Sequence, residues 1–369
     1  MRAIPRLEDV DTPALLVDGP KLVENVRRMA ARARRAGVDL WPHSKTHKSL
    51  AVAAVQREHG IAGLTAATPH EAETFADGGV EDILIAYPPV GGRLERVIGL
   101  SKRIRIRVVL DDAGTARALD EACRTAGTEV GYLWEVDSGA GRIGVEPGPA
   151  AAAVIAPVAE RTRHAVFAGL MSFAGHAYAA GSQAEIGDVA EGEGRSVLET
   201  ASALADAGVE ARALSVGTTP TSHQLEREGA VTEIRPGNYV FYDGTQVALG
   251  VAPLEWCALS VLGTVVARPG PDRLILDTGM KALSGEVLSP STRGFGLVLG
   301  RPELFVRQLY EEHAIVTSDE PIEIPVGERL RVVPNHACTC VNLHDRMLVI
   351  ENGSVADVWT VDARGWRAL

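Results

Sequence analysis

The sequence predicts an α/β protein in which a (β/α)8 TIM barrel over residues 1–250 is followed by an antiparallel β domain over residues 251–369. Three observations support this prediction. Short apolar segments alternate with longer segments of helical spacing between residues 20 and 240, eight of the short segments are strand candidates, and long helical segments stop after Leu254. A doubly wound open sheet is the alternative that the same alternation allows.

The eight barrel strand candidates are rich in β-branched residues or are bounded by Gly and Pro. They are Asp39–Pro42, Gly63–Ala67, Asp82–Tyr87, Ile104–Leu110, Val130–Val136, Ala168–Phe173, Ala213–Val216 and Thr232–Ile234. The helix candidates are Lys21–Ala36, Ser49–His59, Pro69–Asp77, Arg93–Ser101, Ala113–Ala126, Pro149–Glu160, Glu191–Ala207 and a short one around Gln224–Gly229. Alternating strands and helices form parallel βαβ units, and eight such units close a barrel.

The residues after Leu254 predict an all-β region, because strand candidates follow one another through turns such as Pro269–Asp272 and Asn352–Ser354. The strand candidates are Trp256–Ala267, Arg273–Asp277, Glu323–Ile324, Arg329–Val333, Met347–Ile350 and Val355–Val361. An early strand candidate, Ala14–Val17, either opens the barrel or pairs with this C-terminal sheet.

Composition and charge predict a soluble, cytoplasmic protein that acts on a small molecule. The net charge is −11, and basic residues gather only around Arg27–Arg35 and Lys102–Arg107, which argues against nucleic acid or an anionic membrane as partner. Met1–Asp11 lacks the apolar core of an export signal, and no uninterrupted apolar stretch has the length of a membrane span. Four cysteines in 369 residues do not make a disulfide framework.

Polar loops follow the predicted strands at their carboxyl ends, which is where barrel enzymes place their active sites. These loops are Pro42–Lys48, Asp137–Arg142, Gly175–Tyr178, Gly217–Pro220 and Arg235–Tyr239. The last two offer glycine amides and hydroxyls that suit a phosphate group, so a phosphorylated ligand is expected. Lys45 is then either a counter-charge for the phosphate or a lysine that forms a Schiff base with pyridoxal 5′-phosphate (PLP).

The same loops carry a resemblance to a known family. Pro42-His43-Ser44-Lys45-Thr46-His47-Lys48, Glu135–Asp137 through Arg142–Gly144, Arg235–Tyr239 and Val333–Cys338 resemble, in order, the motifs of the D-threonine aldolase and D-serine dehydratase family. The resemblance covers Thr12 to Gly365. It implies a PLP enzyme related to alanine racemase, with a barrel followed by a β domain, and it implies a homodimer.

The resemblance also implies roles for individual residues. Lys45 would hold PLP as a Schiff base and move the α-proton, and Arg142 would donate to the phenolic oxygen of the cofactor. Arg235 would face the pyridine nitrogen and leave it unprotonated, because a guanidinium does not give up its proton. The phosphate would be held by Thr218, Thr219, Gly237 and Asn238. His176 and Tyr178 match an active-site segment, His176 as a catalytic residue and Tyr178 as a contact of the cofactor.

A divalent metal is expected at His336 and Cys338. The two residues are two apart, so in an extended segment both side chains leave the same face and can bind one ion. Imidazole and thiolate favour zinc, with Mn²⁺ as the alternative, and the resemblance supports a metal here. Cys340 would be a third ligand or a packing residue, and Glu311–His313 would support the site or form a solvated acidic face.

The expected reaction is lyase chemistry on a β-hydroxy-D-amino acid. A metal on the β-hydroxyl either stabilises hydroxide as the leaving group, giving a 2-oxo acid and ammonia, or lowers the pKa of the hydroxyl so that the Cα–Cβ bond breaks, giving glycine and an aldehyde. The His-x-Cys pair resembles the pair found in D-serine dehydratases, whereas D-threonine aldolases more often have His-x-Asp at this place. The resemblance therefore favours elimination from D-serine or 3-hydroxy-D-aspartate. The alternatives are a D-threonine aldolase, a racemase and a PLP-binding homeostasis protein without turnover.

Overall fold

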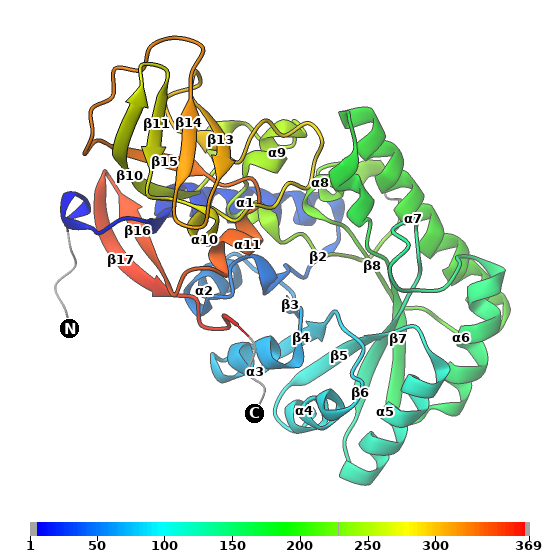
Figure 1. The fold of residues 1–369 in the computed structure, drawn as a ribbon. Helices are drawn as coiled ribbons and strands as arrows, with labels where there is room; N and C mark the ends of the chain where they lie inside the picture. The colour runs from blue at the N-terminus through cyan, green and yellow to red at the C-terminus, as the bar shows by residue number, and fades with distance from the viewer. Residues whose placement is uncertain (1–5, 228, 366–369) are drawn as a thin grey trace.

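The computed structural model describes residues 6–227 and 229–365, and two β-sheets organise them (Figure 1). The first is a parallel eight-stranded sheet with the order β2-β9-β8-β7-β6-β5-β4-β3. Its strands are β2 Asp39–Leu40, β3 Leu64–Ala66, β4 Asp82–Ile85, β5 Arg105–Leu110, β6 Val130–Glu135, β7 Ala165–Met171, β8 Ala213–Val216 and β9 Glu233–Ile234. The ring closes between β2 and β3, where a parallel bridge joins His43 to Thr65 and the Thr65 amide donates to the Pro42 carbonyl at 2.9 Å.

Helices separate these strands and cover the barrel, as the alternation predicts. They are α1 Gly19–Ala36, α2 Leu50–Glu58, α3 Pro69–Asp77, α4 Gly92–Ser101, α5 Ala113–Ala126, α6 Pro149–Arg161, α7 Gln183–Asp206 and the short α8 Thr219–Ser222. α7 begins at Gln183 rather than at the expected Glu191, because the Ser182 hydroxyl caps it by accepting from the Glu185 amide. The short eighth helix appears as the 3₁₀ turn η4, Leu225–Arg227, and Glu228 within the predicted range lies outside the described residues.

The second sheet has nine strands in the order β11-β14-β13-β12-β15-β10-β1-β16-β17. Its strands are β1 Ala14–Asp18, β10 Leu259–Gly270, β11 Arg273–Leu276, β12 Leu297–Val298, β13 Phe305–Leu309, β14 Ala314–Thr317, β15 Arg329–Val333, β16 Arg346–Glu351 and β17 Ser354–Thr360. β11 also pairs with β10, so the antiparallel strands from β10 to β15 curl into a small barrel. The predicted fold class, a TIM barrel followed by an antiparallel β domain, is confirmed.

The early strand β1 belongs to the second sheet. Of the two places predicted for Ala14–Val17, the barrel and the C-terminal sheet, the second is therefore correct. β1 pairs antiparallel with β10 and parallel with β16. Within the described residues, the chain therefore passes from β1 in the second sheet into the barrel at α1 and returns to the second sheet after β9.

One strand expected in the β domain is wrong, and three observed strands go beyond the expected ones. Glu323–Ile324 pairs with no strand, because Pro321 and Pro325 flank it and cannot donate to a ladder. Strands β12 to β14 were not among the predicted strands. A register shift between Val306 and Gln308 interrupts the alternation of buried and exposed residues in β13, and β12 is only two residues long.

The segment after β9 connects the two parts of the molecule. It contains the 3₁₀ turn η5 Asn238–Val240, the helix α9 Gly244–Ala248 and the 3₁₀ turn η6 Leu254–Trp256. The amides of Gly244 and Thr245 donate to the carbonyls of Pro334 and Asn335 at 2.9 and 3.1 Å. These bonds hold the start of the helix α11, Ala337–Val341, against the carboxyl end of the barrel. Among the described helices, none combines the length and apolar character of a membrane span.

Candidate active site

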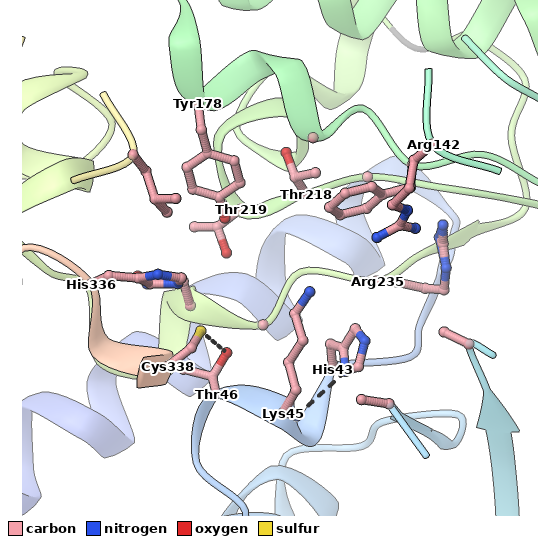
Figure 2. A pocket seen from close by; sticks show the side chains of 18 of the residues that line it. His43, Lys45, Thr46, Arg142, Tyr178, Thr218, Thr219, Arg235, His336 and Cys338 are labelled. Carbon is pink, nitrogen blue, oxygen red and sulfur yellow. Dashed lines mark hydrogen bonds between the residues drawn. The ribbon is translucent and has the colours of Figure 1, made fainter. Parts of the chain in front are cut away.

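A cavity of about 470 Å³ lies at the carboxyl ends of the barrel strands, beside α11 of the β domain (Figure 2). Its size is typical of small-molecule sites. The predicted site residues that line it are Lys45, Arg142, Tyr178, Thr218, Thr219, Arg235, Gly237, Asn238, His336 and Cys338. The fold therefore brings together residues that are almost 300 positions apart, as the distance from Lys45 to Cys338 along the chain shows.

Lys45 projects into the middle of the cavity from the 3₁₀ turn η2, Ser44–Thr46, which follows β2 (Figure 2). The turn is fixed by the Ser44 hydroxyl, which donates to the Thr65 carbonyl at 3.0 Å, and by the Lys45 amide, which donates to His43 Nδ1 at 3.4 Å. Burial lowers the pKa of the Lys45 amine and outweighs the opposing charge of Cys338, and the charge of Arg142 lowers this pKa further. A lowered pKa makes an amine a better nucleophile near neutral pH.

The cavity wall is cationic on one side of Lys45. Arg142 and Arg235 lie there, and no Asp or Glu among the described residues lines the cavity. The ring of Phe173 lies 4.4 Å from Arg142 Cζ and 5.2 Å from Lys45 Nζ, measured to the ring centroid. Cationic side chains without carboxylates in the wall suit an anionic ligand.

Arg235 is buried and is tied to the ends of the neighbouring strands. Its guanidinium donates to the carbonyl of Val216 at 3.1 Å and to the carbonyl of Ser172. Burial lowers the pKa of this guanidinium, whereas the carboxylates of Glu193 and Glu135 behind it act in the opposite direction. Arg235 therefore stays a fixed cation whose orientation depends on the ends of β7 and β8.

The loops after β8 and β9 form a cradle lined by hydroxyls. Thr218 caps α8, and its hydroxyl and that of Thr221 form a reciprocal capping box. The Thr219 hydroxyl accepts from the Tyr239 amide at 3.1 Å, which joins the two loops. Gly237 lies where a Cβ atom would stand 2.8 Å from Thr46 Oγ1 and 3.0 Å from the His43 carbonyl oxygen, so a larger residue would push η2 away.

Tyr178 and His176 share the 3₁₀ turn η3, Gly175–Ala179, but only Tyr178 lines the cavity. Burial raises the pKa of the Tyr178 phenol, so it is neutral at physiological pH. The His176 ring lies beside Gly139, 3.5 Å from where a Cβ of that glycine would be. The His176 ring thus borders the Asp137–Arg142 loop, and the catalytic role of His176 stays a prediction.

His336 and Cys338 do come together, but the extended segment expected for them is wrong. Ala337–Val341 is helical, with His336 as its N-terminal cap residue. In a helix the residue two further on no longer shares a face, and the Cys340 thiol accordingly points away and donates to the Ala282 carbonyl at 3.2 Å. His336 and Cys338 meet because the backbone of His336 is still extended where the helix begins.

The His336 and Cys338 side chains polarise each other. Burial raises the pKa of the Cys338 thiol, but the neighbouring His336 and Lys45 outweigh burial and lower it. Burial likewise lowers the pKa of His336, and the thiolate and Glu286 outweigh it and raise that pKa well above its usual value. Thr46 Oγ1 lies 3.2 Å from the sulfur, and His336 Nδ1 lies 2.7 Å from Glu286 Oε2.

Glu311–His313 does not reach the cavity. The carboxylates of Glu311 and Glu312 are exposed and pair with Lys281 at 3.0 and 2.8 Å. Of the two interpretations of this segment, the described geometry favours the solvated acidic face.

The structure adds functional residues that sequence reasoning missed. His43, Thr46 and Phe173 line the cavity, and Glu286 orients His336 from an irregular segment without periodicity. Thr46 and His43 stand inside the Pro42–Lys48 motif, so that motif contained the signal for them. Nothing in the sequence around Glu286 distinguishes it from a surface carboxylate.

The fold and the site together define a barrel enzyme whose catalytic cavity is completed by a β domain. The family model described as Alanine racemase, N-terminal domain, matches residues 17–244, and that of a serine dehydratase domain matches residues 258–350. The D-threonine aldolase of Arthrobacter sp is 32% identical over 372 residues, which cover 98% of this chain and 94% of that protein. The D-threo-3-hydroxyaspartate dehydratase of Delftia sp. (strain HT23) is 34% identical over 351 residues, 89% of this chain and 91% of that one.

A solved structure, the D-threonine aldolase from Filomicrobium marinum, has a TM-score of 0.91 at 31% identity and covers 99% of this chain and 98% of its own. The chain thus belongs to the alanine racemase N-terminal domain family, in the branch of D-threonine aldolases and D-serine dehydratases, which are PLP-dependent lyases of D-amino acids. The predicted family and enzyme class are confirmed. The homodimer stays a prediction.

Proposed function

We propose that the protein is a metal-assisted PLP enzyme that eliminates the β-hydroxyl of a D-amino acid, D-serine or 3-hydroxy-D-aspartate, to give a 2-oxo acid and ammonia. One observation carries the proposal. The Lys45 amine stands between a cationic wall with Arg142 and Arg235 and a soft donor pair, His336 and Cys338 (Figure 2). This arrangement offers an anion site, an amine and a metal-binding pair within one cavity.

The residues present fit PLP. The cavity wall holds Lys45, Arg142 and Arg235 without a carboxylate, which suits a ligand with a phosphate and a phenolate. Lys45 would hold the cofactor, Arg142 and Arg235 would hold its ring oxygen and ring nitrogen, and Thr218, Thr219, Gly237 and Asn238 would hold its phosphate. When bound, PLP supplies an electron sink for the bond broken at Cα. The Lys45 amine then removes the α-proton, and it can act as this base because burial lowers its pKa.

The donor pair fits zinc, a borderline-soft divalent metal that binds imidazole and thiolate, and Mn²⁺, a harder ion, is the alternative. Burial raises the pKa of the Cys338 thiol, but the neighbouring His336 lowers it more strongly. The lowered pKa favours the thiolate, which is the form that binds metal. Glu286 has a lowered pKa, so it is an acceptor, and His336 Nδ1 must donate to it and leave Nε2 for a metal. Within residues 6–227 and 229–365, no cluster of three or more His, Cys, Asp or Glu could hold a metal, so water and substrate would fill the remaining positions.

Two solved variants of a D-threo-3-hydroxyaspartate dehydratase support this assignment. One has a cysteine replaced by alanine and is the metal-free form, and the other has a histidine replaced by alanine two residues earlier. His336 and Cys338 have the same spacing and order. A metal held by them would supply a Lewis acid for the β-oxygen of the substrate.

Retro-aldol cleavage to glycine and an aldehyde is the second candidate. The likeness to D-threonine aldolases over nearly the whole chain favours it. Both reactions use the same residues, so the difference lies in which bond at the β-carbon breaks.

Product analysis with D-threonine tests the proposal, because this substrate can take both routes. Purified protein loaded with PLP and zinc should yield 2-oxobutyrate and ammonia, and a Lys45→Ala protein treated identically should yield neither. Glycine and acetaldehyde as the main products would overturn elimination and establish the second candidate. No turnover of D-threonine, D-serine or 3-hydroxy-D-aspartate would overturn both.

A further inference from the structure

The carboxylate of Glu193 lies between two loops of the site, although Glu193 itself does not line the cavity. Glu193 is on α7 and is fully buried. Its Oε1 accepts from the Ala174 amide at 3.0 Å and from the Gly217 amide at 3.2 Å. Its Oε2 accepts from the Thr221 hydroxyl at 3.4 Å.

The position of these amides explains why a side-chain acceptor of this length is needed there. β7 and β8 are neighbours in the barrel, and the Ser172 amide still donates to the Ser215 carbonyl at 3.0 Å. Beyond that bond the segments after β7 and β8 separate into different loops. The amides of Ala174 and Gly217 donate to Glu193 instead of to a neighbouring strand. A buried amide without an acceptor costs about 1–3 kcal/mol, so one side chain satisfies two donors that the sheet no longer pairs.

Each bonded amide stands directly before residues of the site. Ala174 precedes η3, which carries Tyr178, and Gly217 precedes the Thr218 and Thr219 hydroxyls. The Thr221 hydroxyl bonded to Glu193 also accepts from the Thr218 amide at 2.8 Å. The same carboxylate therefore contacts both the loop that carries Tyr178 and the loop that carries the Thr218 and Thr219 hydroxyls.

We propose that Glu193 is a positioning residue that fixes the loops after β7 and β8 relative to each other, so that Tyr178 and the Thr218–Thr219 hydroxyls meet one bound cofactor. The inference rests on the proposed function, because it assigns those residues to PLP. Glu193 touches neither cofactor nor substrate and acts only through the two loops.

Two conservative variants of Glu193 distinguish the effect of its side-chain length from the effect of its charge. Glu193→Gln keeps the length and the Oε1 acceptor but removes the charge, whereas Glu193→Asp keeps the charge but is one methylene too short to meet both amides. Thr200→Val is the matched control, because Thr200 is a buried residue of the same helix whose hydroxyl accepts from the Gly148 amide at 2.8 Å, at the start of α6 and outside the cavity wall.

The test combines PLP titration by absorbance with hydrogen exchange of the cofactor-free protein, read on peptides over residues 172–182 and 215–224. Glu193→Asp should raise the PLP dissociation constant about tenfold and speed exchange in both peptides, in keeping with the loss of one buried hydrogen bond. Glu193→Gln should stay within about threefold of wild type in the same titration. Thr200→Val should lower the melting temperature without changing either readout.

The proposal is overturned if Glu193→Asp leaves the dissociation constant within twofold and both peptides unchanged, or if only one loop responds. It is also overturned if Glu193→Gln is as impaired as Glu193→Asp, since charge would then matter instead of reach. Wild-type protein that binds no PLP would refute the proposed function, while exchange in the cofactor-free protein would still decide whether Glu193 holds the two loops.

Discussion

Two substitutions of Lys45 distinguish its two possible roles, a Schiff-base lysine and a counter-charge for the phosphate. Lys45→Ala removes both the amine and the charge, whereas Lys45→Arg keeps the charge and removes the nucleophile, since a guanidinium keeps its proton. We expect both variants to lose the visible absorbance band of bound PLP. If Lys45→Arg kept the spectrum of the wild-type protein, Lys45 would be a counter-charge only.

Cys338 and Cys340 form a matched pair for the metal assignment. They are two residues apart on α11, but the sulfur of Cys338 lines the cavity beside Thr46, and that of Cys340 is buried against Ala282. We expect Cys338→Ala to lose stoichiometric zinc in elemental analysis and Cys340→Ala to retain it. Undiminished zinc in Cys338→Ala would contradict the site.

Glu135 makes the stability of the cofactor-free protein depend on pH. Burial raises its pKa from 4.5 to about 7, against the opposing charges of Arg142 and Arg235. A raised pKa means that the folded state favours the protonated acid, so this stabilisation is complete below about pH 4.5 and is lost as the pH rises through about 7. At 1.36 kcal/mol per pKa unit the loss is on the order of 3 kcal/mol.

Thermal melts of cofactor-free protein at pH 5 and pH 8 measure this contribution. The fall in melting temperature between the two pH values should be smaller in Glu135→Gln than in wild type, and the exposed Glu199→Gln should behave as wild type. Equal falls in Glu135→Gln and wild type would show that Glu135 does not titrate in this range.

At the scale of elements, Asp243 links the barrel to the helix that carries the thiolate. Its Oδ2 accepts from the Asn238 side-chain amide and, at 2.8 Å, from the Ala337 amide at the start of α11, while its Oδ1 accepts from the Gln246 amide at 3.1 Å. One buried carboxylate therefore sets the distance between the cradle and the His336–Cys338 pair.

Asp243→Asn replaces one acceptor oxygen by a donor and leaves a buried amide unpaired, which costs about 1–3 kcal/mol. We expect a lower melting temperature together with reduced zinc content. Asp120→Asn is the control, because Asp120 accepts from the amides of Arg163, His164 and Ala165 at the start of β7, the opposite end of the barrel. Loss of zinc in the control as well would mean that instability alone accounts for the effect.

Elements were predictable where local pattern and burial agree. All eight barrel strands and the bounds of α3 and α5 follow from periodicity and from caps such as Thr68 and Asp112. The predictions failed where tertiary contacts override the pattern, as at α11. The Ala337 amide at the start of that helix donates to Asp243, a residue 94 positions away along the chain. Motif residues such as Lys45 were predictable, whereas Glu286 and Glu193 acquire their roles only from the packing of distant segments.

The proposed domain boundary at residue 250 separates the alternating strand and helix pattern from the all-β pattern of the sequence. It does not separate the strands of the two sheets. β1 precedes the barrel in sequence, yet it is a central strand of the second sheet between β10 and β16. Its residues Leu15, Leu16 and Val17 are buried in that sheet. On the other side, Asn25 of α1 donates to the Trp256 carbonyl at 2.9 Å, beyond the boundary. The two parts therefore stabilise each other.

A chain cut at residue 250 should accordingly not fold as two independent pieces. Residues 1–250 alone would expose both edges of β1 and its apolar side chains, each worth about 1.5–3 kcal/mol when buried, and would lose the hydrogen bond between Asp243 and Ala337. We expect this fragment to aggregate or melt without cooperativity, and co-expression with residues 251–369 to restore a cooperative melt and zinc binding. A monomeric 1–250 fragment that melts cooperatively within a few degrees of the intact protein would show that the barrel is an autonomous unit and that the pairing of β1 with β10 and β16 is dispensable to it.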